Sequence, residues 1–237
     1  KKDGSRLKYE NVFYLQGQLI FLTSSISSFL KKSTAFASFI SNDGVLDSNF
    51  IKIDEISTAK IKFTGFRFQL SSDKLKFLVC HNKNGKENFS YKVYDNRMNL
   101  IWSKDVQLAY RDIYLYKRGY ILDNDGNVHM YAKINPNKQK GKKSLGDNPP
   151  KVLLFSYNYK LDKLSEIEIG LTEKYMKLIS YNFKDDTKKV VFGGFYSDDK
   201  FDTDINGTFY LVVDLNKSVV EKVSTTPFDK TFLIDMI

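Results

Sequence analysis

The stretch Lys92-Val-Tyr-Asp-Asn-Arg-Met-Asn-Leu100 shows the pattern that decides the fold. An apolar-alternating segment leads into a polar turn and the chain then returns, which is typical of a β-hairpin. Strand-built repeats of this length are typical of propeller blades. Three other stretches share the pattern: Ser38-Phe-Ile-Ser-Asn-Asp-Gly-Val-Leu46, Phe155-Ser-Tyr-Asn-Tyr-Lys-Leu-Asp-Lys-Leu164 and Val212-Val-Asp-Leu-Asn-Lys-Ser-Val219.

Each of these hairpins belongs to a quartet of predicted strands. The quartets cover residues 8–57, 62–108, 111–171 and 174–226, and the first turns of the quartets lie at Gln16, Ser72, Asn124 and Asp185, spaced by 56, 52 and 61 residues. We therefore predict an all-β fold: a single β-propeller domain or propeller fragment over residues 1–237, with about four blades of four antiparallel strands. A β-sandwich does not explain the even spacing. Propellers commonly have more than four blades, so we expect this chain to be part of a larger one.

Composition excludes several classes of protein. With 4 Pro and 13 Gly among 237 residues, the chain is neither collagen-like nor disordered. It contains no run of 18 apolar residues, so we predict no membrane span. Cys80 is the only cysteine, so no internal disulfide forms, and its place in a predicted strand favours a buried, inert thiol. The sequence begins with Lys1 rather than Met and ends on an apolar segment, from which we expect further chain at both ends.

Several sequence segments resemble those of a known group of proteins. They are Asn11–Leu19, Phe68–Leu78, Val93–Trp102, Asp123–Val128, Gly194–Ser197 and Asn206–Phe209. Together they resemble exported β-propeller proteins of unassigned function from Bacteroidota-type bacteria. The resemblance covers nearly the whole chain and concerns architecture. It implies an exported protein of the periplasm or cell envelope, and it names no activity.

The densest acidic cluster is the candidate metal site. Asp198, Asp199, Asp202 and Asp204 lie in the predicted connection between the second and third strands of the last quartet. Carboxylates on a flexible loop can surround a calcium ion, and a weakly bound calcium is the one cofactor that we consider. A solvated loop is the alternative, which Lys200 in the middle of the cluster favours.

Other candidate motifs favour structural roles. Asp123-Asn-Asp-Gly-Asn127 has part of a calcium-loop pattern, but a strand follows where further ligands are needed, so we predict a turn. His81 and His129 stand alone in predicted strands, without the partners that catalysis or metal binding needs. The sequence contains no nucleophile elbow, zinc-protease motif or phosphate loop. We therefore assign no catalytic or cofactor-binding residues.

The charge balance bears on partners. Lys and Arg number 37 against 28 Asp and Glu, giving a net charge of +9, with lysines scattered over the turns. The connection 135–150 carries four of them, Lys138, Lys140, Lys142 and Lys143, without interleaved aromatic residues that would stack on bases. We interpret it as an exposed hairpin extension and expect no nucleic-acid partner, because such a footprint needs clustered cations.

These observations favour a binding protein over an enzyme. We expect a non-enzymatic propeller scaffold that mediates protein–protein interaction in an exported or cell-envelope protein, with another protein, or an envelope complex, as its partner. Loops on a rigid scaffold are well suited to this role. The alternative is a carbohydrate-binding or hydrolytic propeller with a site at the central channel.

Overall fold

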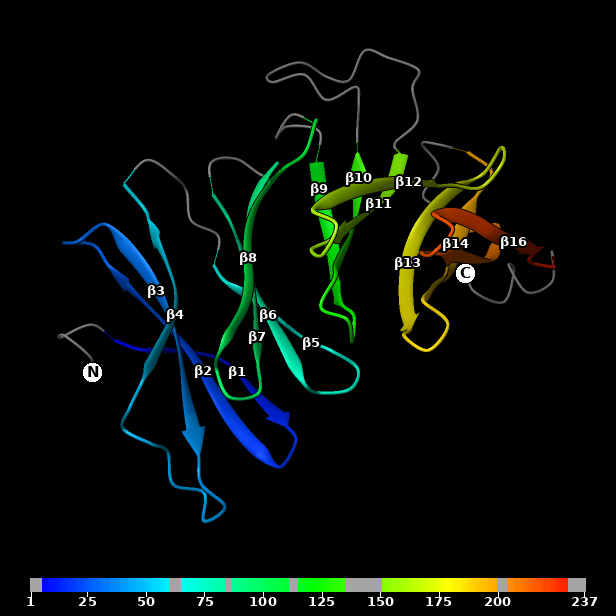
Figure 1. Cartoon of the computed structure of the whole chain (residues 1–237). Coiled ribbons are helices and arrows are strands. Elements are labelled where there is room, and N and C mark those ends of the chain that lie inside the picture. The colour runs from blue at the N-terminus through cyan, green and yellow to red at the C-terminus, as the bar shows by residue number, and fades with distance from the viewer. Residues whose placement is uncertain are drawn as a thin grey trace. The chain divides into compact units, whose positions relative to one another are not determined.

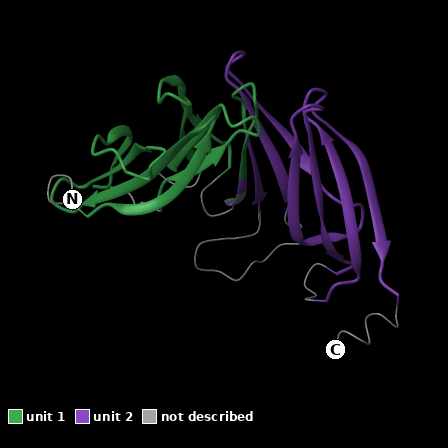
Figure 2. Ribbon diagram, turned by 90° about the horizontal axis from the view of Figure 1, so that it is seen from below, with its two compact units in different colours: residues 1–115, 120–128 green, residues 116–119, 129–237 purple. Residues whose placement is uncertain are grey.

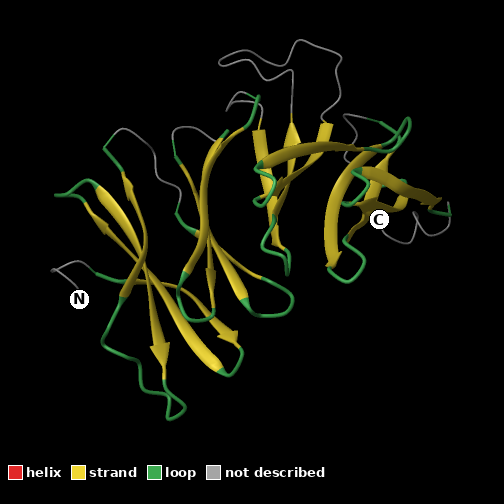
Figure 3. Cartoon of the chain, in the orientation of Figure 1, coloured by secondary structure: helices red, strands yellow, loops and turns green. Residues whose placement is uncertain are grey.

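The structure is a computed structural model, and it describes residues 6–59, 65–83, 87–110, 115–134, 151–199 and 204–229. The connection 135–150 and the segment 230–237 therefore lie outside the described residues, so our predictions for them stay predictions. Every regular element described is a strand (Figure 3). The strands are β1 (Lys8–Leu15), β2 (Gln18–Ser27), β3 (Lys32–Ile40), β4 (Ile51–Ser57), β5 (Arg67–Leu70), β6 (Lys76–Asn82), β7 (Asn88–Asp95), β8 (Leu100–Gln107), β9 (Leu115–Leu122), β10 (Val128–Ile134), β11 (Lys151–Asn158), β12 (Lys163–Ile169), β13 (Tyr175–Lys184), β14 (Lys189–Ser197), β15 (Gly207–Asp214) and β16 (Val219–Pro227).

The strands form four antiparallel sheets, each with its strands in chain order (Figure 1). Blade 1 contains β1–β4, blade 2 contains β5–β8, blade 3 contains β9–β12 and blade 4 contains β13–β16. This arrangement confirms the prediction of an all-β fold built from four-stranded propeller blades. Among the described residues, no helix is long and apolar enough to cross a membrane.

The chain divides into two compact units (Figure 2). Unit 1 holds blades 1 and 2 together with residues 120–128, and unit 2 holds residues 116–119 and everything from His129 onward. The boundary therefore runs through blade 3.

Turn chemistry explains why the strands reverse where they do. Blade 1 turns from β1 to β2 through Gln16 and Gly17 alone, with φ values of 43° and 86°, which is the conformation of a two-residue hairpin turn. In blades 2 and 3, an aspartate opens a five-residue turn and accepts two hydrogen bonds from the asparagine that closes it. Asp95 accepts from Asn99 and Asp123 accepts from Asn127 through both the backbone N–H and the side-chain amide. The second case confirms that the motif 123–127 is a turn.

The core of unit 1 lies between blades 1 and 2. Leu15, Ile20 and Leu22 of blade 1 pack there with Phe77 and Val79 of blade 2. Because blade 2 is covered on both faces, β6 is buried along nearly its whole length, whereas burial alternates along β1. Cys80 is buried in β6, as predicted.

Strand β14 is buried mainly on one face. Val190 and Phe192 are fully buried, but Val191 and Phe195, which point to the other face, are only half-buried. Phe192 contacts Tyr131 of blade 3, with ring centroids 5.7 Å apart. In the described part of unit 2, blade 3 covers one face of blade 4 and no sheet covers the other.

Irregular pairing recurs at the outermost strands. The register shifts between Ala35 and Phe36 in blade 1, between Val93 and Tyr94 in blade 2, and between Val212 and Val213 in blade 4. A further shift separates Met176 from Ile179 on β13. Such bulges bend the strand and increase its twist.

Candidate functional site

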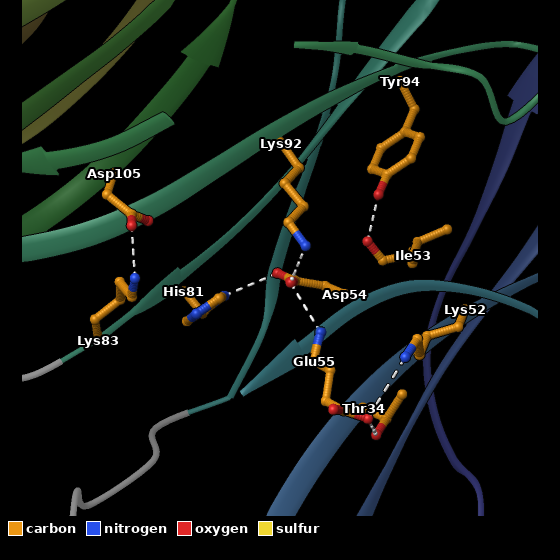
Figure 4. A network of polar contacts seen from close by, with 10 residues as sticks. All are labelled: Thr34, Lys52, Ile53, Asp54, Glu55, His81, Lys83, Lys92, Tyr94 and Asp105. Carbon is orange, nitrogen blue, oxygen red and sulfur yellow. Dashed lines mark hydrogen bonds and ion pairs between the residues drawn. The ribbon is translucent and has the colours of Figure 1, made fainter. Parts of the chain in front are cut away.

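A polar network lies inside the interface between blades 1 and 2 (Figure 4). The carboxylate of Asp54 on β4 contacts an imidazole and an ammonium group. Its Oδ2 lies 2.8 Å from Nδ1 of His81 on β6, and its Oδ1 lies 2.7 Å from Nζ of Lys92 on β7. The side chains of Asp54 and His81 are 1% and 3% exposed, while that of Lys92 is 26% exposed. Residues distant in the sequence therefore meet because β4 packs against the second sheet.

Neighbouring groups provide further contacts to the buried network. The backbone N–H of Glu55 donates to Asp54 Oδ1 at 2.8 Å, and Phe66 meets the His81 ring edge-on with centroids 5.5 Å apart. The Tyr94 hydroxyl donates a short hydrogen bond to the carbonyl of Ile53. A buried charge needs this degree of pairing, since an unpaired one costs several kcal/mol.

Electrostatics follow from this geometry. Burial by itself raises the pKa of Asp54, but the hydrogen bonds and charges of His81 and Lys92 outweigh burial and bring the pKa below its ordinary value. Burial, together with the charge of Asp54, raises the pKa of Tyr94 to about 12. Asp54 therefore remains ionised and Tyr94 remains a hydrogen-bond donor at neutral pH.

The ion pairs of Asp54 connect blade 1 to blade 2. A histidine oriented by a carboxylate is also part of hydrolytic triads, where the imidazole must contact a nucleophile. Buried Ser90 lies opposite His81 in the β6–β7 register. In the described structure, however, no hydrogen bond joins its hydroxyl to the imidazole. The side-chain contacts of Asp54 with His81 and Lys92 both join blade 1 to blade 2.

His129 lies in a different setting. Its Nδ1 is 2.7 Å from the hydroxyl of Ser156 on β11, and its ring is 5.8 Å from that of Phe183. His81 is near the end of β6, whereas His129 is near the start of β10, so the two histidines occupy opposite ends of equivalent strands.

The predicted acidic cluster is only partly described. Asp198 pairs with Lys174 at 2.6 Å, and its backbone N–H donates to the side chain of Asn206. The backbone N–H of Asp199 donates to Ser197. Asp204 is described, but Asp202 lies outside the described residues. Among the described ranges, no group of three or more metal-ligating side chains is assembled. The weak calcium site remains a prediction.

Blade 1 carries an open groove that sequence reasoning missed. It has a volume of about 760 Å³ and lies between the β1–β2 turn and the β3–β4 connection. Its lining residues are Gln16, Gly17, Gln18, Phe39, Ile40, Ser41, Asn42, Val45 and Asp47. The length of the β3–β4 connection could have indicated the groove. Ten residues, 41–50, separate β3 from β4, whereas the equivalent connections are the four-residue segments 96–99, 159–162 and 215–218.

Unit 2 holds two adjoining pockets of about 230 and 370 Å³ between blades 3 and 4. Both are lined by Lys133, Val152, Met176 and Lys177. Two lysines that line the smaller pocket form ion pairs, Lys151 with Glu168 at 2.7 Å and Lys174 with Asp198. The cleft is therefore lysine-rich but substantially neutralised.

Comparison with solved structures supports the fold. The β-propeller domain of the Trilobed protease from Pyrococcus furiosus, which has an open velcro topology, superposes with a TM-score of 0.51 at 11% identity, over 95% of this chain and 57% of that one. Pyrococcus horikoshii acylaminoacyl peptidase gives a TM-score of 0.53 at 10% identity, over 95% and 32%. The chain thus spans less than two thirds of either protein. No family model matches it, and no curated protein matches it.

Proposed function

We propose that the chain is a non-enzymatic β-propeller scaffold of an exported or cell-envelope protein and that it binds another protein. The observation that carries the proposal is an apolar tip on the β2–β3 turn of blade 1. Phe29 is 93% exposed, and Ile26 and Leu30 beside it are 61% and 60% exposed. Single exposed apolar residues are ordinary, but two on this turn and a third at the adjoining end of β2 resemble the anchors that fill a partner's pocket.

The tip is held in place by the scaffold. Strands β2 and β3 pair without a break as far as Ser27 and Lys32. The backbone N–H of Leu30 donates to the Ser27 hydroxyl at 3.1 Å, and the carbonyl of Lys31 accepts from the backbone of Thr58 at 2.7 Å. A preformed tip loses little conformational entropy on binding, which strengthens an interaction of modest area.

Charges of both signs lie around the tip. Glu55 lies 2.9 Å from Lys32 and 3.8 Å from Lys52. A polar rim of mixed charge around apolar residues is typical of protein interfaces. The resemblance to exported propellers supports the proposed location in the envelope.

Site-specific photocross-linking tests this function. A photoreactive phenylalanine analogue at position 29 should give one discrete protein adduct in cells that make the protein, and that adduct should disappear when Leu30 is also changed to Ala. The matched control is the same analogue at Leu161, which is 72% exposed on the β11–β12 turn and should give no such adduct. Equal adducts at both positions, or sedimentation of the protein with anionic vesicles through Phe29, would contradict the proposal. Cell fractionation tests the envelope location.

A further inference from the structure

The groove on blade 1 exists because one connection is longer than its counterparts. Each of the other blades joins its third and fourth strands through four residues, namely 96–99, 159–162 and 215–218, whereas blade 1 uses the ten residues 41–50. Four residues suffice to close this hairpin, so the additional six are not needed to form the blade. Ordered connections longer than the fold requires are frequently functional.

The longer connection is ordered by its own hydrogen bonds. Within the turn, Gly44 donates to the carbonyl of Ser41, and Val45 donates to the Ser41 hydroxyl. At its base, the backbone N–H of Asp47 donates to the carbonyl of Phe39 at 2.8 Å, and the hydroxyl of Ser38 donates to the carbonyl of Asp47 at 2.6 Å. The wall of the groove is therefore formed before any ligand arrives.

The chemistry of the lining is unlike that of the chain as a whole. Among the residues that the structure describes, no lysine or arginine lines this groove, although the chain carries 37 of them. Planar amide groups are supplied by Gln18, Asn42 and Gln16, whose Oε1 already accepts from the side-chain amide of Asn96 at 3.2 Å. Asp47 adds one carboxylate, whose Oδ1 accepts from the backbone N–H of Asn49 at 2.8 Å. Phe39 and Ile40 add half-buried apolar surface. The groove thus offers paired donors and acceptors beside an apolar patch, with no cation to attract a polyanion.

From this combination we infer that the blade 1 groove binds a neutral glycan. Two adjacent hydroxyl groups of a sugar can pair with the donor and the acceptor of one planar amide, or with the two acceptor oxygens of one carboxylate. The C–H face of a sugar ring can lie on the apolar surface at Phe39. An open groove at the end of a sheet suits a chain of sugars better than a small compact ligand, which needs an enclosing pocket.

NMR titration of the whole chain tests this assignment. The probes are neutral hexasaccharides: cellohexaose, xylohexaose, laminarihexaose, maltohexaose and chitohexaose. At least one should shift the side-chain amide signals of Gln18 and Asn42 at millimolar concentration. Changing both to Ala should weaken its binding about tenfold or more, since the double variant loses side chains that hydrogen-bond directly to the ligand. Asn216→Ala, on the equivalent turn of blade 4, should leave binding unchanged.

A second variant replaces residues 41–50 with the four-residue turn Asn96-Arg-Met-Asn99 of blade 2. It should keep its thermal transition and lose the glycan, and Phe29→Ala should bind the glycan normally because the apolar tip lies at the other end of β2 and β3. Three results would each overturn the assignment: no shift with any neutral hexasaccharide, unchanged affinity in the Gln18→Ala, Asn42→Ala variant, or binding of acidic oligosaccharides alone.

Discussion

Asp54 shows how one residue can join two blades. It brings a carboxylate into an otherwise apolar interface, where His81 and Lys92 compensate it. Asp54→Asn should lower the free energy of unfolding by about 3–5 kcal/mol, because it removes the charge that pairs with two other buried or partly buried groups. Chemical denaturation measures the change. The control is Asp105→Asn, which breaks the exposed ion pair with Lys83 and should cost less than about 1 kcal/mol.

The same residue predicts a pH dependence. The pKa of Asp54 is lower in the folded protein than in the unfolded chain, so its stabilising contribution is complete above the unfolded value of about 4 and is lost as pH falls through the lowered folded pKa. Stability should therefore decline in acid. Denaturation curves at pH 7 and at pH values below 4 should show a smaller decline for Asp54→Asn than for the unaltered chain. Equal declines in both would show that the carboxylate is not stabilised by folding.

Gly194 on β14 has no room for a side chain. A Cβ atom there would lie 1.8 Å from the carbonyl oxygen of Leu178, within the bulge of β13. Gly194→Ala should destabilise the protein by about 1–3 kcal/mol or more, because a backbone atom must move. The neighbouring Gly193→Ala is the control: its Cβ would meet nothing closer than 3.7 Å and should change the thermal transition little. Comparable losses in both variants would contradict this geometry.

At the scale of the strand, the two faces of β14 should differ in energetic weight. Phe192→Ala opens a cavity against Tyr131 and should cost about 3–5 kcal/mol. Phe195→Ala, on the half-buried face, should cost clearly less, since its ring is only partly covered and contacts Phe228 with centroids 6.0 Å apart. Thermal denaturation of the two variants gives the comparison, and a larger loss for Phe195→Ala would reverse the assignment of faces.

Strands and turns were predictable from sequence because their signals are local. Alternation of apolar residues and the evenly spaced turns at Gln16, Ser72, Asn124 and Asp185 placed the four quartets. Phe77 and Phe192 are buried in their strands. The Asp54–His81 contact joins residues 27 positions apart in different sheets, and no local pattern encodes it. The groove was missed for a related reason: Ser38–Leu46 contains a hairpin signal, but that signal does not state how far the connection extends beyond a normal turn.

Across the described residues, lysine charges are paired on each of the four blades. Exposed lysines pair with carboxylates on every blade: Lys32 with Glu55, Lys83 with Asp105, Lys151 with Glu168 and Lys189 with Glu221. Random DNA or RNA should therefore bind no more tightly than the micromolar range at physiological salt, since sequence-independent affinity requires several phosphate contacts on one face. Fluorescence anisotropy measures this. A sub-micromolar dissociation constant would show a clustered cationic face.

The register shifts at the outer strands have a consequence for self-association. An unpaired strand edge is a template on which a second molecule can add its own strand, and this is a common start of aggregation. In blades 1, 2 and 4 the outermost pair carries a bulge, which twists the exposed edge and interrupts its row of backbone donors and acceptors. These strand edges are thus poor templates for edge-to-edge polymerisation, which favours a dispersed protein at high concentration.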